Sequence, residues 1–203
     1  MITIVDYGLG NIQAFADMYK RLHIEARPAR TAQELESAKK IILPGVGAFD
    51  WAMARLNASG MRETLDRLVK EEQRPVLGVC VGMQMMADSS DEGELPGLGW
   101  IPARVKRFDD SRFTQKARLP HMGWNDALPR AGESLFHGMD DPRFYFLHSY
   151  YFVPDSQEHV LATTDYNGQY ASAVRSGNVY GTQFHPEKSH HWGMQLLKNF
   201  AEI

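Results

Sequence analysis

The only cysteine of the chain stands between two glycines, in the segment GVCVG. Cys80 follows an apolar run and precedes a helical pattern, with Gly78 and Gly82 two residues away on either side. This arrangement is typical of a nucleophile elbow, a strained strand-to-helix turn that exposes a nucleophile at the carboxyl edge of a sheet. A helix start behind the sulfur would also favour the thiolate. Because a lone cysteine is more commonly an inert core residue, the assignment requires a base.

The candidate base lies in the segment QFHPEK, where His185 and Glu187 are separated by Pro186. In an extended segment residues i and i+2 point to the same side, and we expect Pro186 to keep the chain extended. A carboxylate on one imidazole nitrogen sets the tautomer and leaves the other nitrogen to take the thiol proton. Alone, H-x-E is equally consistent with a loop histidine and a solvated carboxylate. Together with Cys80 it predicts a Cys-His-Glu triad.

A thiolate that attacks a carbonyl needs backbone donors for the developing oxyanion. The amide of Val81, directly after the nucleophile, is one candidate. The second is expected from the loop PGVGAF (44–49), where Gly45 and Gly47 allow the backbone to approach a ligand or to reorient. An ordinary tight strand-to-helix turn is the alternative interpretation of this loop.

The elements that must position these residues alternate in the front half of the chain. Apolar, β-rich runs cover 2–6, 24–27, 39–45 and 75–80, and helical patterns cover 11–22, 49–56 and 61–70. Thr31 and Glu34 fit a capping box at the start of a further short helix. Continuous apolar strands separated by helices predict a parallel sheet covered on both faces.

The back half is mostly extended. A glycine- and proline-rich loop leads into an alternating strand over 93–108, and further extended runs cover 120–125, 144–153, 160–164, 170–175 and 178–185. The segment SGN (176–178) predicts a hairpin turn, and 192–202 predicts a final helix. We find no internal repeat, low-complexity tract or linker. The chain is therefore expected to form a single domain over 1–203, an α/β fold with a mainly parallel sheet and an antiparallel extension.

The composition excludes several classes of function. A net charge of −3 gives no electrostatic reason to expect nucleic acid or an anionic membrane. No apolar run approaches the roughly 20 residues that span a bilayer, and the start, MITIVDYGLGN, lacks the basic region of a signal peptide. One cysteine excludes an internal disulfide, so a reducing cytoplasm is the expected compartment.

Three segments, IILPGVGAF, GVCVGMQ and QFHPE, resemble in this order the triad-type (class I) glutamine amidotransferases, and the resemblance covers essentially the whole chain. It implies a flavodoxin-like α/β fold and hydrolysis of glutamine to glutamate and ammonia through a cysteine thioester, without cofactor or metal. By this resemblance Cys80 is the nucleophile, His185 the general base and acid, and Glu187 the orienting carboxylate. Gly47 and Val81 would form the oxyanion hole, after a flip of the PGVG loop.

Within the family, the segments DYGLGN, PGVGAF, PHMGWN, FLHSYYF and HPEKS are most similar to glutaminase subunits of histidine biosynthesis. Those subunits form a heterodimer with a barrel-type synthase (cyclase) that makes imidazole glycerol phosphate and AICAR. The similarity implies that PHMGWN faces the synthase, with Trp124 beside the ammonia passage. The implied partner-facing residues are Trp124, Asn125, Tyr145 and Lys188. The implied glutamine-contacting residues are Gln84, Glu92, Ser149 and Tyr150.

The sequence departs from the familiar pattern at two places. Ala14 stands where the pattern often has serine, and HPEKS continues into His190, His191 and Trp192. His185, Glu187, His190 and His191 lie within seven residues, which is compatible with a metal site. Because catalysis already uses two of them and no second cluster supports a metal, we expect none.

Three other functions fit parts of the sequence. Related glutaminases supply ammonia to a synthase-like partner that builds amidino groups on bacterial surface sugars, and SSDEGELPGLGWIPARV and EKSHHWG resemble that branch at least as well. A non-catalytic regulatory subunit would keep the fold, but the intact triad residues argue against it. A stand-alone cysteine hydrolase or peptidase would need a wider substrate cleft than these small elaborations on an α/β core provide.

Overall fold

The fold is that of a computed structural model, which describes residues 1–114 and 118–203. Its centre is a block of five parallel strands in the order β2-β1-β3-β4-β13. The bounds are Ala26–Ala29 for β2, Ile2–Val5 for β1, Lys40–Gly45 for β3, Val76–Cys80 for β4 and Val179–Thr182 for β13. All four residues of β1 and all five of β4 are buried, as expected for strands covered on both faces.

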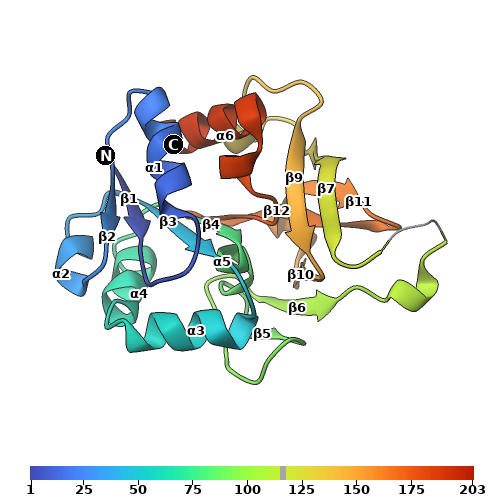
Figure 1. The fold of residues 1–203 in the computed structure, drawn as a ribbon, viewed down its shortest axis with the longest axis horizontal. Helices are drawn as coiled ribbons and strands as arrows, with labels where there is room; N and C mark the ends of the chain where they lie inside the picture. The colour runs from blue at the N-terminus through green and yellow to red at the C-terminus, as the bar shows by residue number, and fades with distance from the viewer. Residues whose placement is uncertain (115–117) are drawn as a thin grey trace.

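Helices cover both faces of this parallel block (Figure 1). The helices α1 (Ile12–Arg21) and α6 (His190–Glu202) lie together on one face, and α3 (Phe49–Ala58) and α4 (Arg62–Lys70) lie on the other. The short helix α2 (Ala32–Leu35) contacts α4, and half of its predicted capping box is present. Thr31 accepts a bond from the Glu34 amide, whereas the Glu34 carboxylate accepts from the Arg30 amide and not from that of Thr31. The helical pattern predicted over 11–22 is confirmed by α1, whose buried residues Phe15, Met18 and Tyr19 recur at helical spacing.

A mainly antiparallel set of strands extends the sheet beyond β13, and within it the β5–β6 pair is parallel. The order continues as β12-β10-β6-β5, and β11 pairs with both β12 and β8. The bounds are Gln169–Ser176 for β12, Tyr150–Pro154 for β10, Ala103–Arg107 for β6, Ser89–Ser90 for β5, Val160–Asp165 for β11 and Leu128–Pro129 for β8. The predicted hairpin turn at 176–178 joins β12 to β13, where Ser176 pairs with Val179. The predicted fold class, a mainly parallel sheet with an antiparallel extension, is confirmed.

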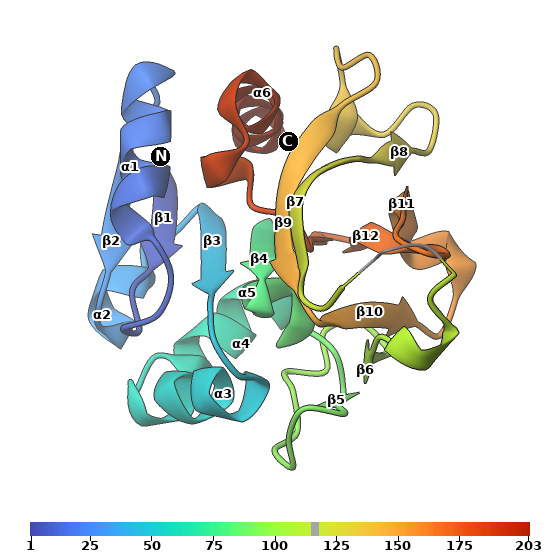
Figure 2. The same ribbon diagram turned by 45° about the vertical axis from the view of Figure 1, so that its right-hand side comes forward.

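A separate two-stranded ribbon consists of β7 (His121–Asp126) and β9 (Arg143–His148). Figure 2 shows the two long strands side by side, next to β4 and the one-turn helix α5 (Val81–Gln84). The prediction of one extended run over 144–153 is wrong in this respect: the run breaks at Ser149. Its first part pairs with β7 and its second part, β10, belongs to the main sheet. Alternation along a strand shows which residues face inward but not which strand is the partner.

Short 3₁₀ turns complete the chain. They are η1 (Asp110–Arg112), η2 (Ser134–Phe136), η3 (Gln157–His159) and η4 (Pro186–Lys188). In the part of the chain that the structure describes, no helix is long and apolar enough to cross a membrane.

Candidate active site

Cys80 is the last residue of β4 and adopts a left-handed backbone conformation, with φ +56° and ψ −113°. Non-glycine residues seldom have positive φ, and such strain persists only where the surrounding structure enforces it. The chain enters α5 at the next residue, Val81, so the strand-turn-helix geometry of an elbow is present as predicted.

The two flanking glycines allow the elbow to pack against itself and against its neighbour strand. A Cβ on Gly82 would lie 1.9 Å from the carbonyl oxygen of Leu43 on β3. A Cβ on Gly78 would lie 2.7 Å from the carbonyl oxygen of Gly82. Both distances are far below a normal contact and involve backbone atoms. The G-x-C-x-G spacing therefore reflects a lack of room for side chains.

The helix behind Cys80 is shorter than the sequence indicates. The α5 helix has four residues, so it supplies only a small part of the dipole of a full helix. Electrostatic support for a thiolate must therefore come mainly from a neighbouring cation, and His185 is in that position.

His185 and Glu187 are brought together as predicted, but by a different backbone. The Nδ1 atom of His185 lies 2.8 Å from Oε1 of Glu187, and their side chains are 4% and 3% exposed. The segment between them is not extended, because Pro186–Lys188 forms the 3₁₀ turn η4. The expectation that Pro186 keeps this segment extended is therefore wrong. The tight turn, rather than the two-residue repeat of a strand, places the two side chains side by side.

The environment of His185 favours its protonated form. Burial is the largest influence and lowers its pKa, but hydrogen bonds to Cys80 and Glu187, together with their charges, outweigh burial and raise the pKa to about 10. With Nδ1 occupied by Glu187, the other ring nitrogen is the one available to the sulfur. An imidazolium beside the sulfur is the arrangement that stabilises a thiolate in cysteine hydrolases.

A pocket of about 290 Å³ opens over Cys80 and His185. Its lining includes nine of the residues named from the sequence: Gly47, Cys80, Val81, Gln84, Glu92, Ser149, Tyr150, His185 and Lys188. Glu92 accepts a hydrogen bond of 3.0 Å from the amide of Phe49, at the start of α3. Burial raises the pKa of Glu92, while this hydrogen bond lowers it. Segments far apart in the chain therefore converge on one pocket.

The residues predicted to face a partner divide into two groups. Trp124 is 42% exposed, stacks on His190 at 5.3 Å between ring centroids and meets Tyr145 edge to face at 6.4 Å. Lys188 Nζ lies 5.9 Å from the centre of the Tyr145 ring. Asn125 is not brought to this group. Its side-chain amide donates instead to the carbonyl of Asp165, at 2.9 Å.

Several residues at the site were not identified from the sequence. Ser189 is fully buried and ties two segments together: its hydroxyl donates to the His185 carbonyl at 2.6 Å and accepts from the Tyr145 amide at 2.9 Å. Gln183 is also buried, with Nε2 at 3.9 Å from the Cys80 sulfur. Both lie within quoted segments, QFHPE and HPEKS, yet each has a partner far away along the chain, Cys80 for Gln183 and Tyr145 for Ser189. The sequence therefore contains no signal for these contacts.

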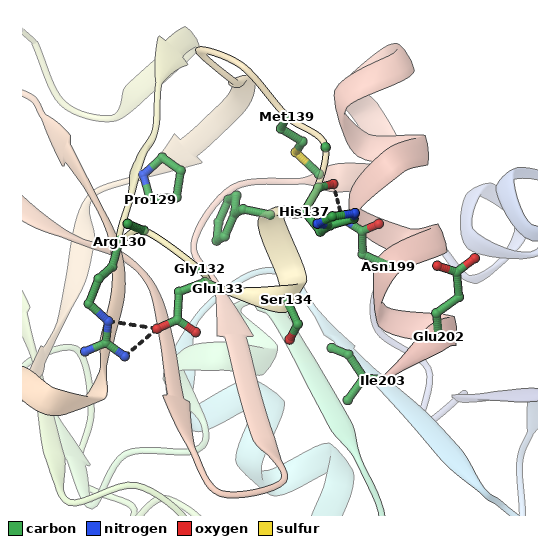
Figure 3. Close-up of a pocket in the computed structure, with 13 residues that line it drawn as sticks. Pro129, Arg130, Gly132, Glu133, Ser134, His137, Met139, Asn199, Glu202 and Ile203 are labelled. Carbon is green, nitrogen blue, oxygen red and sulfur yellow. Dashed lines mark hydrogen bonds and ion pairs between the residues drawn. The ribbon is translucent and has the colours of Figure 1, made fainter.

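The structure also has a second hollow, between the 129–139 loop and α6, which shares no lining residue with the pocket at Cys80 (Figure 3). Its charged and amide side chains already have partners within the protein: Arg130 pairs with Glu133, and Asn199 donates to the carbonyls of Leu135 and His137. Within the described ranges, no three His, Cys, Asp or Glu side chains gather as metal ligands. The pocket at Cys80 remains the one with an arrangement suited to covalent chemistry.

Comparison with known proteins gives consistent matches along the chain. The family model for glutamine amidotransferase class-I matches residues 3–203. A protein of Bdellovibrio bacteriovorus described as imidazole glycerol phosphate synthase subunit HisH is 61% identical, and one of Leptospira interrogans with the same description is 48% identical. Both alignments cover 100% of this chain and of the relative.

Solved structures show the same fold at low sequence identity. A crystal structure of a glutamine amidotransferase superposes with a TM-score of 0.76 at 24% identity, covering 99% of this chain and 97% of the other. The structure of PurLQS from Thermotoga maritima superposes with a TM-score of 0.73 at 17% identity, covering 99% and 97%.

Proposed function

This chain belongs to the class I glutamine amidotransferase family, and we propose that it is the glutaminase subunit of an imidazole glycerol phosphate synthase in histidine biosynthesis. In this role it hydrolyses glutamine to glutamate and passes the ammonia to a synthase. The observation that carries the proposal is that one small pocket brings together a strained Cys80, the His185 of the His185–Glu187 pair, and the residues predicted to contact glutamine.

The first half-reaction makes a thioester. The Cys80 thiolate bonds to the carboxamide carbon of glutamine, and the carbonyl electrons move onto oxygen, where the Val81 amide and a donor near Gly47 stabilise the oxyanion. The tetrahedral intermediate then collapses as the carbon–nitrogen bond breaks. His185 gives its proton to the leaving nitrogen, so ammonia and a glutamyl thioester result.

The second half-reaction restores the enzyme. His185, now neutral, takes a proton from water as the water oxygen bonds to the thioester carbon. The carbon–sulfur bond breaks, glutamate leaves, and Cys80 is again a thiolate beside a protonated His185. Glu187 stays hydrogen-bonded to Nδ1 throughout, which holds the ring in the tautomer that both steps require.

The dimensions of the pocket favour an amino acid over a peptide. Its volume of about 290 Å³ lies at the lower end of the roughly 300–1,000 Å³ typical of ligand sites. Glu92 supplies a carboxylate suited to an α-ammonium group, and the Ser149–Tyr150 segment lies on the same pocket wall. A stand-alone peptidase would need an open groove for the flanking residues of its substrate.

The outer face of the β7–β9 ribbon is proposed to receive the synthase. Met122, Trp124 and Leu147 are 64%, 42% and 37% exposed, and we call these three residues, with Tyr145 and Lys188 beside them, the ribbon face. Large apolar side chains exposed together are typical of an interaction surface. Leu147 and Lys188 also line the catalytic pocket, so the ribbon face adjoins the place where ammonia forms. The synthase is proposed to be of barrel type, and the compartment a reducing cytoplasm, with 1–203 acting as one domain.

The test is glutamate release from glutamine by the purified chain, alone and with a barrel-type cyclase carrying its phosphoribosyl ligand. We expect low activity alone, strong stimulation by the loaded cyclase, and loss of activity in Cys80→Ala in both conditions. Equal turnover with and without the cyclase would contradict the proposed coupling.

A second part of the experiment distinguishes the cyclase from the alternative ammonia acceptor, a sugar-modifying synthase. Reaction of Cys80 with a glutamine-like electrophile, without stimulation by the cyclase, would keep the glutaminase but assign it to a sugar-modifying synthase. Binding of the cyclase without any glutamate release would instead support a regulatory subunit.

A further inference from the structure

A cluster of buried polar rings adjoins the active-site pocket, which its member His148 also lines, and the cluster has no part in the reaction above. It consists of His121 from β7, His148 from β9 and Tyr170 from β12, which are 3%, 6% and 5% exposed. The Tyr170 hydroxyl lies 3.1 Å from Nε2 of His148 and 3.2 Å from Nδ1 of His121. Those two ring nitrogens are 3.3 Å apart. Because buried polar groups are almost always hydrogen-bonded, each contact in this cluster must pair one donor with one acceptor.

The partners of His148 fix its tautomer. Its Nδ1 atom lies 2.7 Å from the backbone carbonyl oxygen of Tyr150, which can only accept a hydrogen bond. Nδ1 must therefore carry the proton. In a neutral ring Nε2 is then the acceptor, and the Tyr170 hydroxyl is positioned to donate to it.

His121 is fixed in the same way from its other end. The side-chain amide nitrogen of Asn125 lies 3.3 Å from Nε2 of His121 and can only donate. The ring therefore accepts at Nε2 and carries its proton on Nδ1, which faces the Tyr170 oxygen. Each ring nitrogen of the cluster thus has a complementary partner, and the donors point in sequence from Asn125 toward the Tyr150 carbonyl.

Electrostatics agrees with this assignment. Burial is the main influence on both rings and lowers the pKa of His148 to about 3 and that of His121 to about 4. The charge of His121 and that of His185 lower the pKa of His148 further, although its bond to Tyr150 opposes them. Both rings are therefore neutral at neutral pH, as the arrangement of donors requires.

The Tyr150 carbonyl is held from two sides. The Gln84 side-chain amide donates to it at 3.2 Å, in addition to the bond from His148, and donates also to Gln183 at 3.1 Å. This carbonyl lies where the chain passes from β9, in the ribbon, to β10, in the main sheet. The segment at the crossing, Ser149 and Tyr150, is also part of the pocket wall.

We propose that His148 is a positioning residue for glutamine: its Nδ1–H fixes the Tyr150 carbonyl and thereby holds the Ser149–Tyr150 backbone in the shape that binds the substrate's α-carboxylate. This inference rests on the proposed function, because it names what holds one wall of the glutamine pocket. His121 and Tyr170 act through His148 by keeping its proton on Nδ1.

Two isosteric variants separate the roles of the two ring nitrogens. Asparagine carries an amide nitrogen on Cγ, where histidine carries Nδ1, whereas glutamine places its amide one bond further out, near Nε2. With the loaded cyclase present, we expect His148→Gln to raise KM for glutamine about tenfold and to change kcat less than about twofold. The contact with the α-carboxylate is equally strong in the ground state and the transition state, so its loss weakens binding without slowing the chemical step. His148→Asn, which can restore the donor, is expected to recover most of that affinity.

The outcomes are distinct. Equal KM values for both variants and the wild type, or equal losses in both variants, would overturn the positioning role. Absence of turnover by the wild-type complex would instead overturn the proposed function itself.

A second measurement does not depend on turnover or on a variant that folds. Nuclear magnetic resonance of ring-labelled histidine in the wild-type chain should show His148 as the Nδ1–H tautomer, with no titration between pH 5 and pH 9. An Nε2–H tautomer would contradict the proposal, since no proton would then face the Tyr150 carbonyl.

Discussion

The elbow and the ribbon both contribute to the catalytic pocket, yet they are built on opposite principles. At the elbow, Gly82 leaves no room for a side chain against Leu43 of β3, and Gly78 leaves none against Gly82 and Met86, so close packing of the backbone places the nucleophile. In the ribbon, side chains rather than backbone make the functional contacts. Its inner face carries the buried ring of His148, and its outer face exposes Met122 and Trp124. The difference indicates that the reacting atom is held by a rigid core, while substrate and partner contacts are assigned to an added element.

The strongest test of the rigid elbow is Gly82→Ala. The new Cβ would lie 1.9 Å from the Leu43 carbonyl, so β3 or the elbow must move, and we expect the free energy of unfolding to fall by about 3 kcal/mol or more. Gly60→Ala is the control, because Gly60 has a φ of +76° but no neighbour within 4 Å of a new Cβ. It should cost only the roughly 1–2 kcal/mol of left-handed backbone. Similar losses in chemical denaturation would show that the elbow is not tightly packed.

Glu187→Gln tests whether the His185–Glu187 pair is an electrostatic unit. The variant keeps the shape of the side chain but removes its charge, so we expect kcat to fall about 100-fold or more while the fold persists. Because Glu187 is one of the groups that raise the pKa of His185, the pH profile of the residual activity should shift to lower pH. If the variant has the pH profile and kcat of the wild type, Glu187 has only a structural role.

Two pH windows of stability follow from the histidines. His121 and His148 have lowered pKa values in the fold, so below about pH 6.5 the unfolded chain binds more protons than the folded chain. The free energy of unfolding therefore decreases as the pH is lowered from about 6.5 toward 4, by roughly 1.4 kcal/mol per pH unit for each ring. His185 has the opposite sign: its stabilisation is complete below about pH 6.5 and is lost as pH rises toward 10.

Chemical denaturation from pH 4 to pH 10 should therefore show a maximum near pH 6.5. The titratable groups that face these two histidines are Tyr170 for both, Tyr166 stacked on His121, and His185 for His148, and the two histidines also face each other. His148→Asn should reduce the slope on the acid side only. An unchanged acid slope in that variant would assign the effect to carboxylates.

The smallest effect on glutaminase turnover is expected at the ribbon face. Trp124→Ala should change glutamate release less than about twofold but should uncouple it from product formation, since the ring lies on the outer face and only its neighbours line the pocket. The ratio of glutamate released to product formed by the synthase measures this. His190→Asn is the matched variant: it removes the ring stacked on Trp124 while asparagine tolerates the φ of +49° at this position. An unchanged ratio in Trp124→Ala would show that Trp124 contributes only to packing and not to ammonia transfer.

The features that could be predicted from the sequence are those that depend on the local backbone geometry of a strand and its turn. The GVCVG spacing predicted the elbow, and the alternation of apolar runs and helices predicted the parallel block, because both depend on contacts local to a strand and its turn. The pairing of His185 with Glu187 was also predicted, but the extended backbone invoked for it was wrong, since η4 is a turn.

The side-chain network behind the pocket could not be predicted. His148 and Ser189 lie in segments that the sequence singled out, yet their partners come from other strands, and a strand's alternation does not identify its neighbours. The break at Ser149 has the same cause: one apolar run serves two sheets. A helix behind Cys80 was predicted, but its end at Gln84 was not, because apolar residues continue past it through Met85 and Met86.

The most direct test of the central claim is mass spectrometry of the wild-type chain quenched in acid during turnover of glutamine with the loaded cyclase. The account predicts a glutamyl adduct on the peptide that contains Cys80, absent from Cys80→Ala and absent when glutamate replaces glutamine. Steady release of glutamate with no adduct on Cys80, or with an adduct on another residue, would contradict it.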